Sequence, residues 1–358
     1  MKRRQFVRLL GLAPGALAAP WDAAQARSKL LSHLLPGDPD DPPDGSRFIP
    51  ATCTECPAGC GMLVEVREGR PIKLEGDPDC PLGRGGLCVR GQASLARLYH
   101  PERLRQPLER AADGELRPIA WEAALERVAA ALGSAAGARD PGFYLAGQTT
   151  GALADLVDAF ARAHGLQVLP GLELFHHGAL RRAHEILFGR REVPTYALGG
   201  PDPADLLVTF GADLFESFLH PVRRAREFAE ARERGLRWFH CEPGLSMTGC
   251  SADRRLALAA GGEPALLLHL LGEIAAGDGA TLPAEVLASL PRMPLEEASR
   301  RTRLSGDALR ELAGALRSAR RPLLLCGGIA TAMPGGGDAA LLAGLLQCAT
   351  GQIGSTVD

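Results

Sequence analysis

Four cysteines in an uneven spacing constrain this chain more than any other feature of its sequence. Cys53, Cys56 and Cys60 form a C-x2-C-x3-C stretch, and Cys88 follows after 27 further residues. Four thiolates are what a [4Fe-4S] cubane requires, one for each iron atom. A tight loop with three ligands and a distant loop with the fourth can enclose such a cluster, so the spacing predicts a [4Fe-4S] centre.

A structural zinc site with four cysteines is the competing interpretation. Zinc sites of this kind usually pair two short cysteine knuckles, and this chain has a single C-x2-C. Cys80 is a fifth cysteine in the same segment, interpreted as a bystander, with a role as an alternative ligand left open. The chain has nine cysteines, five of them within 36 positions. An odd, clustered set argues against a complete disulfide framework and for metal binding.

The residues between the third and the fourth cysteine support one folded unit. Residues 62–67 alternate as a strand does, 68–71 form a turn, and 72–75 form a second strand. This hairpin would carry the chain back to a glycine-rich second ligand loop at 83–88. Gly59 lies in the first loop, where a residue without a side chain lets the backbone approach the inorganic sulfides.

The N-terminus has the features of an export signal. Arg3 and Arg4 are followed by a short apolar run, and residues 24–26 read Ala-Gln-Ala, a typical cleavage site. We interpret residues 1–26 as a twin-arginine signal peptide, with a plain basic terminus as the alternative. Export of a folded protein suits a cluster assembled in the reducing cytoplasm. Residues 27–47, rich in proline, aspartate and glycine, predict a linker.

Composition excludes some classes of partner. Hydrophobic residues make up 46% of the 358 residues and charged residues 23%, as in an ordinary globular chain. The formal net charge is -2 and aromatic residues are only 5%. Nucleic acid requires a basic surface and often aromatic stacking platforms, so it is not an expected partner.

The remainder of the chain alternates between strand and helix patterns. Apolar strand runs at 205–210, 236–241 and 321–326 are separated by helical patterns such as 152–165 and 221–234. Alternation of this kind predicts an α/β fold with doubly wound parallel sheets.

These motifs together resemble the N-terminal half of the molybdopterin oxidoreductase superfamily, the group with a [4Fe-4S] domain before a Mo/W bis-molybdopterin guanine dinucleotide (bis-MGD) site. The cysteine pattern is accompanied by further matching motifs: Glu75-Gly76-Asp77-Pro78, Arg84 to Gly91, Tyr99 to Leu104, and Trp121-Glu122-Ala123-Ala124 at the start of a helix. The resemblance implies a small [4Fe-4S] β-hairpin domain at 48–104, then a partial molybdopterin oxidoreductase-like α/β region at 105–358.

The same resemblance suggests residues that bind cofactor. The family has a lysine two residues after the fourth cysteine, between the cluster and the pterin, and Arg90 takes this position here. Gly211, Asp213 and Glu242 would border the nucleotide of a molybdopterin guanine dinucleotide, and the family pattern extends this to 261–263. Ligand loops at strand ends are expected at the carboxyl edge of a parallel sheet.

Two departures limit the resemblance. Active members of the family are commonly much longer, and residues 350–358 resemble a mid-chain element of the family, so the α/β region is expected to be truncated. No cysteine or serine lies in 174–181, where the family offers a molybdenum ligand, and we predict no catalytic residue. His176 and His177 are adjacent and would point in different directions, so they are not expected to share a metal ion.

Motifs around 188–196 and 209–222 resemble the iron-sulfur subunit of alternative complex III and related quinone-linked complexes. The chain is therefore expected to be an electron-transfer subunit of a membrane-associated respiratory complex, on the periplasmic side, with no membrane span of its own. Its expected partners are a ferredoxin-like iron-sulfur subunit and a quinone-interacting membrane subunit. Two alternatives stay open: a molybdenum bis-MGD oxidoreductase whose second half is on another chain or lost, and a non-catalytic remnant with a zinc or empty site.

Overall fold

The computed structural model describes residues 46–67, 69–135, 142–143, 152–168, 177–277 and 281–358. The predicted signal peptide and almost all of the predicted linker lie outside these residues, so both stay predictions. The chain divides into two compact units. One runs up to Ile49 and includes Leu63–Leu74, and the other consists of Pro50–Met62 and Glu75–Asp358.

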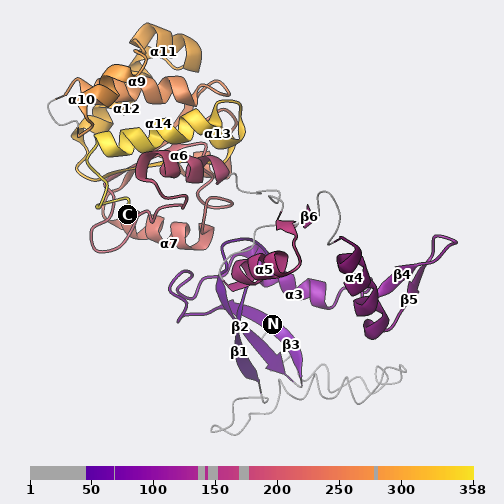
Figure 1. The fold of residues 1–358 in the computed structure, drawn as a ribbon. Coiled ribbons are helices and arrows are strands. Elements are labelled where there is room, and N and C mark those ends of the chain that lie inside the picture. The colour runs from indigo at the N-terminus through magenta and orange to yellow at the C-terminus, as the bar shows by residue number, and fades with distance from the viewer. Residues whose placement is uncertain (1–45, 68, 136–141, 144–151, 169–176, 278–280) are drawn as a thin grey trace, which may run out of the picture. The chain divides into compact units, whose positions relative to one another are not determined.

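A three-stranded sheet follows the start of the described chain (Figure 1). Its strands are β1 (Arg47–Thr52), β2 (Gly61–Arg67) and β3 (Arg70–Gly76), in the order β1-β2-β3. β2 and β3 confirm the two strands expected between the third and the fourth cysteine. β1 was not expected, because most of its side chains are exposed and its sequence carries no apolar alternation.

The next elements are short. Helix α3 (Val89–Leu98) begins directly after Cys88, and β4 (Leu108–Arg110) pairs antiparallel with β5 (Leu116–Pro118). Helix α4 (Trp121–Ala135) confirms the helix expected to begin at Trp121. Helix α5 (Ala152–Ala163) lies in sequence between β6 (Gly142–Phe143) and β7 (Gln167–Val168), which pair in parallel.

The main sheet has four parallel strands in the order β10-β9-β8-β11. They are β8 (Leu206–Phe210), β9 (Arg237–Glu242), β10 (Arg254–Ala257) and β11 (Pro322–Cys326). All residues of β8 and β11 are buried. Strands covered on both faces read as continuous apolar runs, which is why the sequence predicted a parallel, doubly wound sheet.

Helices cover both faces of this sheet, and the alternation of strand residues decides which face each side chain joins. Leu207 and Trp238 pack with Leu180 of α6 (Gly178–Phe188) and Ala231 of α7 (Pro221–Glu233). The opposite face joins α9, α11, α12 and α14 in the larger core. The helices in and around this larger core are α8 (Met247–Ser251), α9 (Glu263–Ala275), α10 (Ala284–Ser289), α11 (Leu295–Thr302), α12 (Gly306–Ser318), α13 (Ile329–Ala332) and α14 (Gly336–Ala349).

The strand order places a topological switch beside β8. β8, β9 and β10 progress outward in one direction, and the chain then returns to put β11 on the other side of β8. In open α/β sheets the loops after two such strands diverge to opposite faces and leave a crevice at the carboxyl edge. A ligand site is therefore expected between the ends of β8 and β11.

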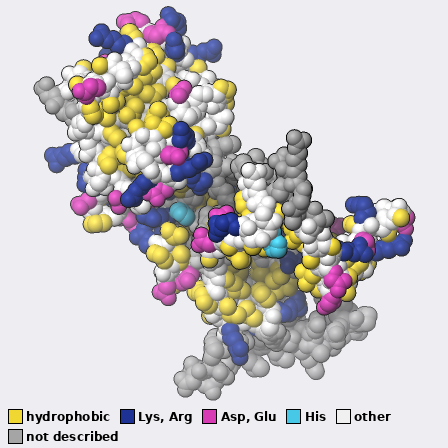
Figure 2. All heavy atoms as spheres, viewed as in Figure 1, with side chains coloured by type: hydrophobic (Ala, Val, Ile, Leu, Met, Phe, Trp, Pro, Cys, Tyr) yellow, Lys and Arg dark blue, Asp and Glu magenta, His cyan; other side chains and the backbone are white. Residues whose placement is uncertain are grey.

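Charges are mixed over the surface of the described residues. On the face shown in Figure 2, basic and acidic side chains are interspersed and form no field of one sign. Within the described parts of the chain, no helix is both long enough and apolar enough to cross a bilayer.

Candidate functional site

The three-cysteine loop is closed by its own backbone. The Cys53 N–H donates to the Cys60 carbonyl oxygen at 2.8 Å, and Gly59 adopts a positive φ of 58° that allows the tight turn. Cys53 and Cys60 are each 6% exposed and pack with Ala58. The loop thus holds two predicted ligands away from water.

The second ligand loop is brought to the first by close backbone packing. A Cβ on Gly76 would lie 2.4 Å from the carbonyl carbon of Gly85, so only glycine allows this crossing. The Gly85 N–H also donates to the Asp77 carbonyl oxygen at 2.9 Å. Arg97 of α3 forms an ion pair with Glu55, which lies between Cys53 and Cys56. The end of β3 and helix α3 therefore carry Cys88 to the three-cysteine loop.

The thiols influence one another electrostatically. Burial, with smaller contributions from the nearby thiols of Cys56, Cys53, Cys88 and Cys80, raises the pKa of Cys60 to about 11. Among the described residues, no three His, Cys, Asp or Glu side chains are close enough together to hold a single metal ion.

Cys80 lies against both ligand loops. The Gly61 N–H donates to its sulfur at 3.3 Å. Hydrogen bonds from the backbone of Gly83, and also of Gly61 and Leu82, hold the pKa of the Cys80 thiol below its ordinary value. Gly61 follows the first loop directly, and Leu82 and Gly83 lie at the start of the second, so this sulfur connects the two loops.

Helix α7 and the segment before it also contact the ligand loops and the start of α3. Val222 packs against the buried cysteines, and Arg84 pairs with Glu230 at 2.8 Å. Arg90, the residue expected near the electron path, donates from its guanidinium to the Glu216 carbonyl oxygen at 2.7 Å. These contacts connect the cysteine loops to the loop that follows β8.

A cavity of about 310 Å³ opens where the switch between β8 and β11 predicts a ligand site. Three of the four predicted cofactor-binding residues, Gly211, Asp213 and Glu242, line it together. Arg90 does not line the cavity, but its partner Glu216 precedes Ser217, which does. The other lining residues are His240, Ser246, Gly328, Ile329 and Ala332.

The crevice depends on two glycines whose backbones cross. Gly211 has a φ of 61°, and a Cβ there would lie 2.6 Å from the Ala330 nitrogen. Gly328 has a φ of 53°, and a Cβ there would lie 2.4 Å from the Gly211 carbonyl oxygen. The loops after β8 and β11 therefore pass close to each other and leave backbone, instead of side chains, around this part of the cavity.

The two carboxylates of the crevice are held differently. Glu242 Oε1 accepts the Ser246 N–H at 3.0 Å and Arg255 Nε at 2.7 Å, while Oε2 lies 3.1 Å from His240 Nε2. Burial alone would raise the pKa of Glu242, but the bonds from Ser246 and Arg255 hold it below its ordinary value. Asp213 Oδ1 accepts the Thr248 hydroxyl at 2.5 Å.

Other residues singled out in the sequence lie elsewhere. Glu263, in the 261–263 stretch, is 1% exposed at the start of α9, where burial raises its pKa, and it does not line the crevice. His177 is buried at the start of α6 with its ring edge against Phe218, and His176 lies outside the described residues.

Sequence reasoning did not assign His240 or Gly328 to the crevice. His240 lies within an apolar strand and looks like a core position. The Gly-Gly pair after β11 was the one available signal for Gly328.

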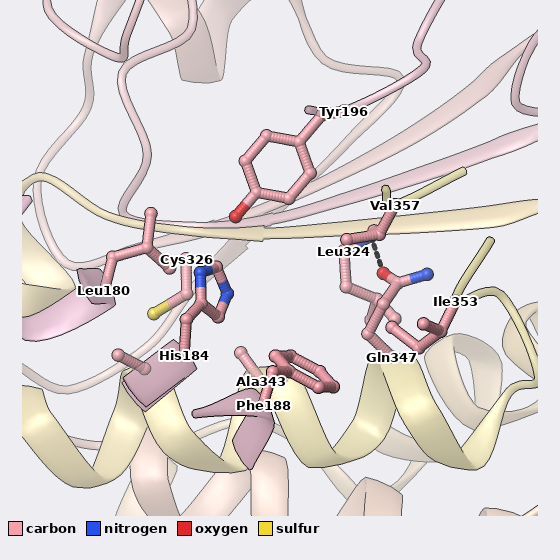
Figure 3. A pocket seen from close by; sticks show the side chains of 12 residues that line it. Leu180, His184, Phe188, Tyr196, Leu324, Cys326, Ala343, Gln347, Ile353 and Val357 are labelled. Carbon is pink, nitrogen blue, oxygen red and sulfur yellow. Dashed lines mark hydrogen bonds between the residues drawn. The ribbon is translucent and has the colours of Figure 1, made fainter. Parts of the chain in front are cut away.

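A second, smaller cavity lies between α6, α14 and β11 (Figure 3). It measures about 20 Å³, room for about one water molecule, and its walls include Tyr196 and Cys326. His184 faces it, with Nδ1 3.0 Å from the Glu192 carbonyl oxygen, and burial lowers the pKa of this histidine. No predicted site residue lines this cavity, and its size excludes a cofactor.

Two family profiles match the chain in succession. The profile described as the molybdopterin oxidoreductase Fe4S4 domain matches residues 46–100, and the profile described as molybdopterin oxidoreductase matches 103–277. Together they cover most of the described residues. The chain belongs to the molybdopterin oxidoreductase family, with a [4Fe-4S] domain followed by a molybdopterin oxidoreductase domain.

Curated relatives share moderate identity with the chain. The menaquinone reductase molybdopterin-binding-like subunit of Nitratidesulfovibrio vulgaris is 28% identical over 96% of this chain. The thiosulfate reductase molybdopterin-containing subunit PhsA of Salmonella typhimurium and the formate dehydrogenase 2 subunit alpha (cytochrome c-553) of N. vulgaris are each 26% identical, over 62% and 77% of it. The chain spans 50% of the first relative's length and 29% and 28% of the other two.

A solved structure confirms the fold. Acetylene hydratase from Pelobacter acetylenicus superposes with a TM-score of 0.66 at 16% identity, covering 85% of this chain and 43% of that one. At this identity the likeness concerns the fold alone. It agrees with the predicted α/β class and the parallel sheet.

Proposed function

We propose that this chain is an iron-sulfur electron-transfer subunit that holds its [4Fe-4S] cluster on Cys53, Cys56, Cys60 and Cys88. The observation that carries the proposal is that Cys53, Cys56 and Cys60 pack together and that Leu87, the neighbour of Cys88 in the second loop, packs against them. The bound cluster would supply one-electron transfer. The chain would supply the ligands, keep water from Cys53 and Cys60, and fix the loops through the Arg97–Glu55 pair.

Arg90 is proposed as a fixed positive charge between the cluster loops and the crevice. Its guanidinium is bound to the Glu216 carbonyl oxygen, one residue from the crevice-lining Ser217. A planar guanidinium stays charged and offers several donors. Arginine is therefore suited to hold a charge at one place beside an electron path.

The crevice is proposed to receive the nucleotide end of a molybdopterin guanine dinucleotide. Its position at the topological switch is where α/β sheets bind nucleotides. Gly211 leaves backbone at the wall of the cavity, and Asp213 offers an acceptor for hydroxyl or amino groups. No residue of the described chain is proposed as a catalytic acid, base or nucleophile.

The proposed setting is a membrane-associated respiratory complex on the periplasmic side. The name of the menaquinone reductase subunit supports a quinone-linked complex, and the resemblance to alternative complex III subunits points the same way. We propose a ferredoxin-like iron-sulfur subunit and a quinone-interacting membrane subunit as partners, with export by the twin-arginine route. Because the chain spans about half of that relative's length, its activity and partners are proposals.

A molybdenum bis-MGD oxidoreductase completed by a second chain is the alternative function. The crevice supports it, because the cavity proposed to receive the nucleotide lies on this chain, and the thiosulfate reductase relative is named a molybdopterin-containing subunit. Molybdenum analysis separates the two: one molybdenum per chain in protein purified with its partners would favour this alternative. A zinc-bound or empty remnant is the third candidate.

The metal content of anaerobically purified protein tests the proposal. We expect about four irons and four sulfides per chain, and an electron paramagnetic resonance signal after dithionite reduction. Changing any one of Cys53, Cys56, Cys60 or Cys88 to alanine should lower the iron content or leave a three-iron cluster. Cys250→Ala, at an exposed cysteine, is the matched control and should keep the full iron content. Bound zinc without iron in the wild type would overturn the proposal.

Localisation is tested separately. Changing both Arg3 and Arg4 to lysine should leave the folded protein in the cytoplasm, because ammonium groups do not reproduce the guanidinium geometry. Cell fractionation followed by immunoblotting measures the result. Normal export of the double variant would contradict the twin-arginine interpretation and leave the iron-sulfur proposal untouched.

A further inference from the structure

We infer that His240 is a positioning residue of the crevice, which locks Glu242 and the loop after it so that Asp213 is the carboxylate that faces the ligand. The inference rests on the proposed function in one respect, that the ligand is a nucleotide. It assigns different roles to two acidic residues that the family resemblance treats alike.

A directed chain of buried hydrogen bonds ends at Glu242. The Trp238 indole N–H, which can only donate, lies 2.9 Å from Thr209 Oγ1. The Thr209 hydroxyl hydrogen has two acceptors within reach, the Phe239 carbonyl oxygen at 3.5 Å and His240 Nδ1 at 2.5 Å, and the much shorter contact assigns it to His240. Nδ1 accepts, so Nε2 carries the ring proton and donates it to Glu242 Oε2 at 3.1 Å.

The surroundings keep the His240 ring neutral and the hydrogen-bonded side chains fixed. Trp238 and Thr209 are fully buried, and His240 is 1% exposed. Burial lowers the pKa of His240, which favours the neutral ring. The register of the sheet places Thr209 directly beside His240, so adjacent strands hold the two side chains together.

Glu242 in turn holds the segment that contains Thr248, the residue that donates a hydrogen bond to Asp213. Its Oε1 accepts the Ser246 N–H, and Ser246 caps α8 by accepting the Gly249 N–H. Thr248, in the first turn of α8, donates to Asp213 Oδ1. His240 therefore acts on Asp213 through Glu242 and Thr248.

The number of donors already bound to Glu242 and to Asp213 decides which carboxylate can accept a hydrogen bond from the ligand. Glu242 accepts from His240, Ser246 and Arg255, and it is 4% exposed. Asp213 is half-buried, and among the described residues only Thr248 donates to its side chain, at Oδ1. Oδ2 of Asp213 is thus the acceptor directed to a ligand.

The lining also defines the chemistry that this acceptor selects. Asp213 and Glu242 line the crevice together with Ser217 and Ser246, and no lysine or arginine of the described chain does so. Arg255 compensates the charge of Glu242, but no described cation pairs with Asp213, and this carboxylate disfavours a phosphate at this end of the site. Ribose hydroxyls and the amino groups of a base are donors without negative charge, so the nucleoside part of the ligand fits here.

Binding of GMP to the purified, cluster-loaded protein tests the inference by isothermal titration calorimetry. Asp213→Asn should weaken GMP binding about tenfold or more, since a hydrogen bond to a charged acceptor is lost, with little change in melting temperature. Asp338→Asn, at an exposed carboxylate of α14, is the matched control and should bind as the wild type does. Unaltered GMP binding by Asp213→Asn, or no GMP binding by the wild type, would overturn the inference.

Combining variants of His240 and Asp213 distinguishes a positioning role of His240 from a general loss of stability. His240→Leu should weaken GMP binding, and His240→Gln, which keeps an N–H donor, should retain more affinity. In the Asp213→Asn background neither change should weaken binding further, because residues that act through one group are not additive. Additive losses would overturn the positioning role.

A spectroscopic readout reports the tautomer of His240 directly. In the wild type, two-dimensional 15N–1H spectra of labelled histidine should contain a signal from a neutral ring protonated at Nε2 that is missing in His240→Gln. A His240 protonated at Nδ1 would contradict the directed chain. Iron per chain is measured in every sample, so failure of this inference with four irons intact is distinguished from failure of the iron-sulfur proposal.

Discussion

At the scale of single residues, the buried histidines illustrate how environment decides what a titratable side chain can do. His184 is 6% exposed and His240 1% exposed, and each is hydrogen-bonded to a fixed neighbour. Burial lowers the pKa of both rings, so both are neutral where free histidine begins to charge. The hydrogen-bond partners of the two rings are a carbonyl oxygen, a hydroxyl and a carboxylate. Both histidines are therefore held by interactions within the fold.

These two histidines predict a pH-dependent stability. In the unfolded chain the pKa of each histidine returns to about 6.5. Below that pH the unfolded state therefore binds protons that the folded state does not bind. The free energy of unfolding should therefore fall as the pH is lowered from about 7 to about 5. Urea titrations across this range measure the slope, and His184→Gln should reduce it.

The carboxylates are accounted for by comparing variants, because burial raises the pKa of Glu263 and this residue therefore opposes the histidine effect as the pH is lowered. The pKa of Glu242 is held below its ordinary value, so its contribution is present at neutral pH and is lost only at lower pH, as the pH falls through that depressed pKa. His164→Gln, at an exposed histidine, serves as the control and should leave the slope unchanged. A free energy of unfolding that stays constant between these pH values would contradict the prediction.

At the scale of elements, the two ligand loops fit together through a contact that no local pattern specifies. A Cβ on Gly61 would lie 2.5 Å from the Cβ of Cys80 and 2.8 Å from its sulfur. The pair is 19 positions apart, and β2 and β3 bring it together. The Cys80 side chain thus occupies the space that the missing side chain of Gly61 leaves.

This fit predicts a reciprocal pair of variants. Gly61→Ala should prevent the two loops from closing and lower the iron per chain well below the wild-type value. Adding Cys80→Gly should restore iron, because the nearest remaining atom is then the Asp77 Cβ at 3.4 Å. Gly133→Ala, at a helical glycine with open space around it, is the control. Iron content that is unaffected by Gly61→Ala, or not rescued in the double variant, would count against the proposed packing.

The sequence alone was sufficient to predict the strands that have a strong apolar pattern. The hairpin strands β2 and β3 and the parallel strands β8, β9 and β11 followed from such patterns. The family resemblance, and not an apolar pattern, pointed to Gly211, Asp213 and Glu242 at strand ends. The strand β1 did not, since its exposed residues leave no apolar alternation. The role of His240 depends on the register between β8 and β9, which sets Thr209 beside it and which no single segment encodes.

At the scale of the whole molecule, some helices present apolar faces to solvent. Trp121, Leu125 and Val128 of α4 are 63%, 62% and 57% exposed. Their spacing of four and three residues places them on one side of the helix. Contiguous exposed apolar side chains are unusual on isolated soluble proteins and mark surfaces that pack against something else.

This stripe predicts the behaviour of the purified chain. Without its partners the protein should self-associate in sedimentation velocity experiments at micromolar concentration, and Leu125→Gln combined with Val128→Thr should reduce the association. Because both side chains are already exposed, the double change should alter the free energy of unfolding by no more than about 0.5 kcal/mol. Leu207→Ala, in the fully buried β8, should instead cost about 2–5 kcal/mol. A chain that remains monomeric with the stripe intact would show that these residues are not an association surface.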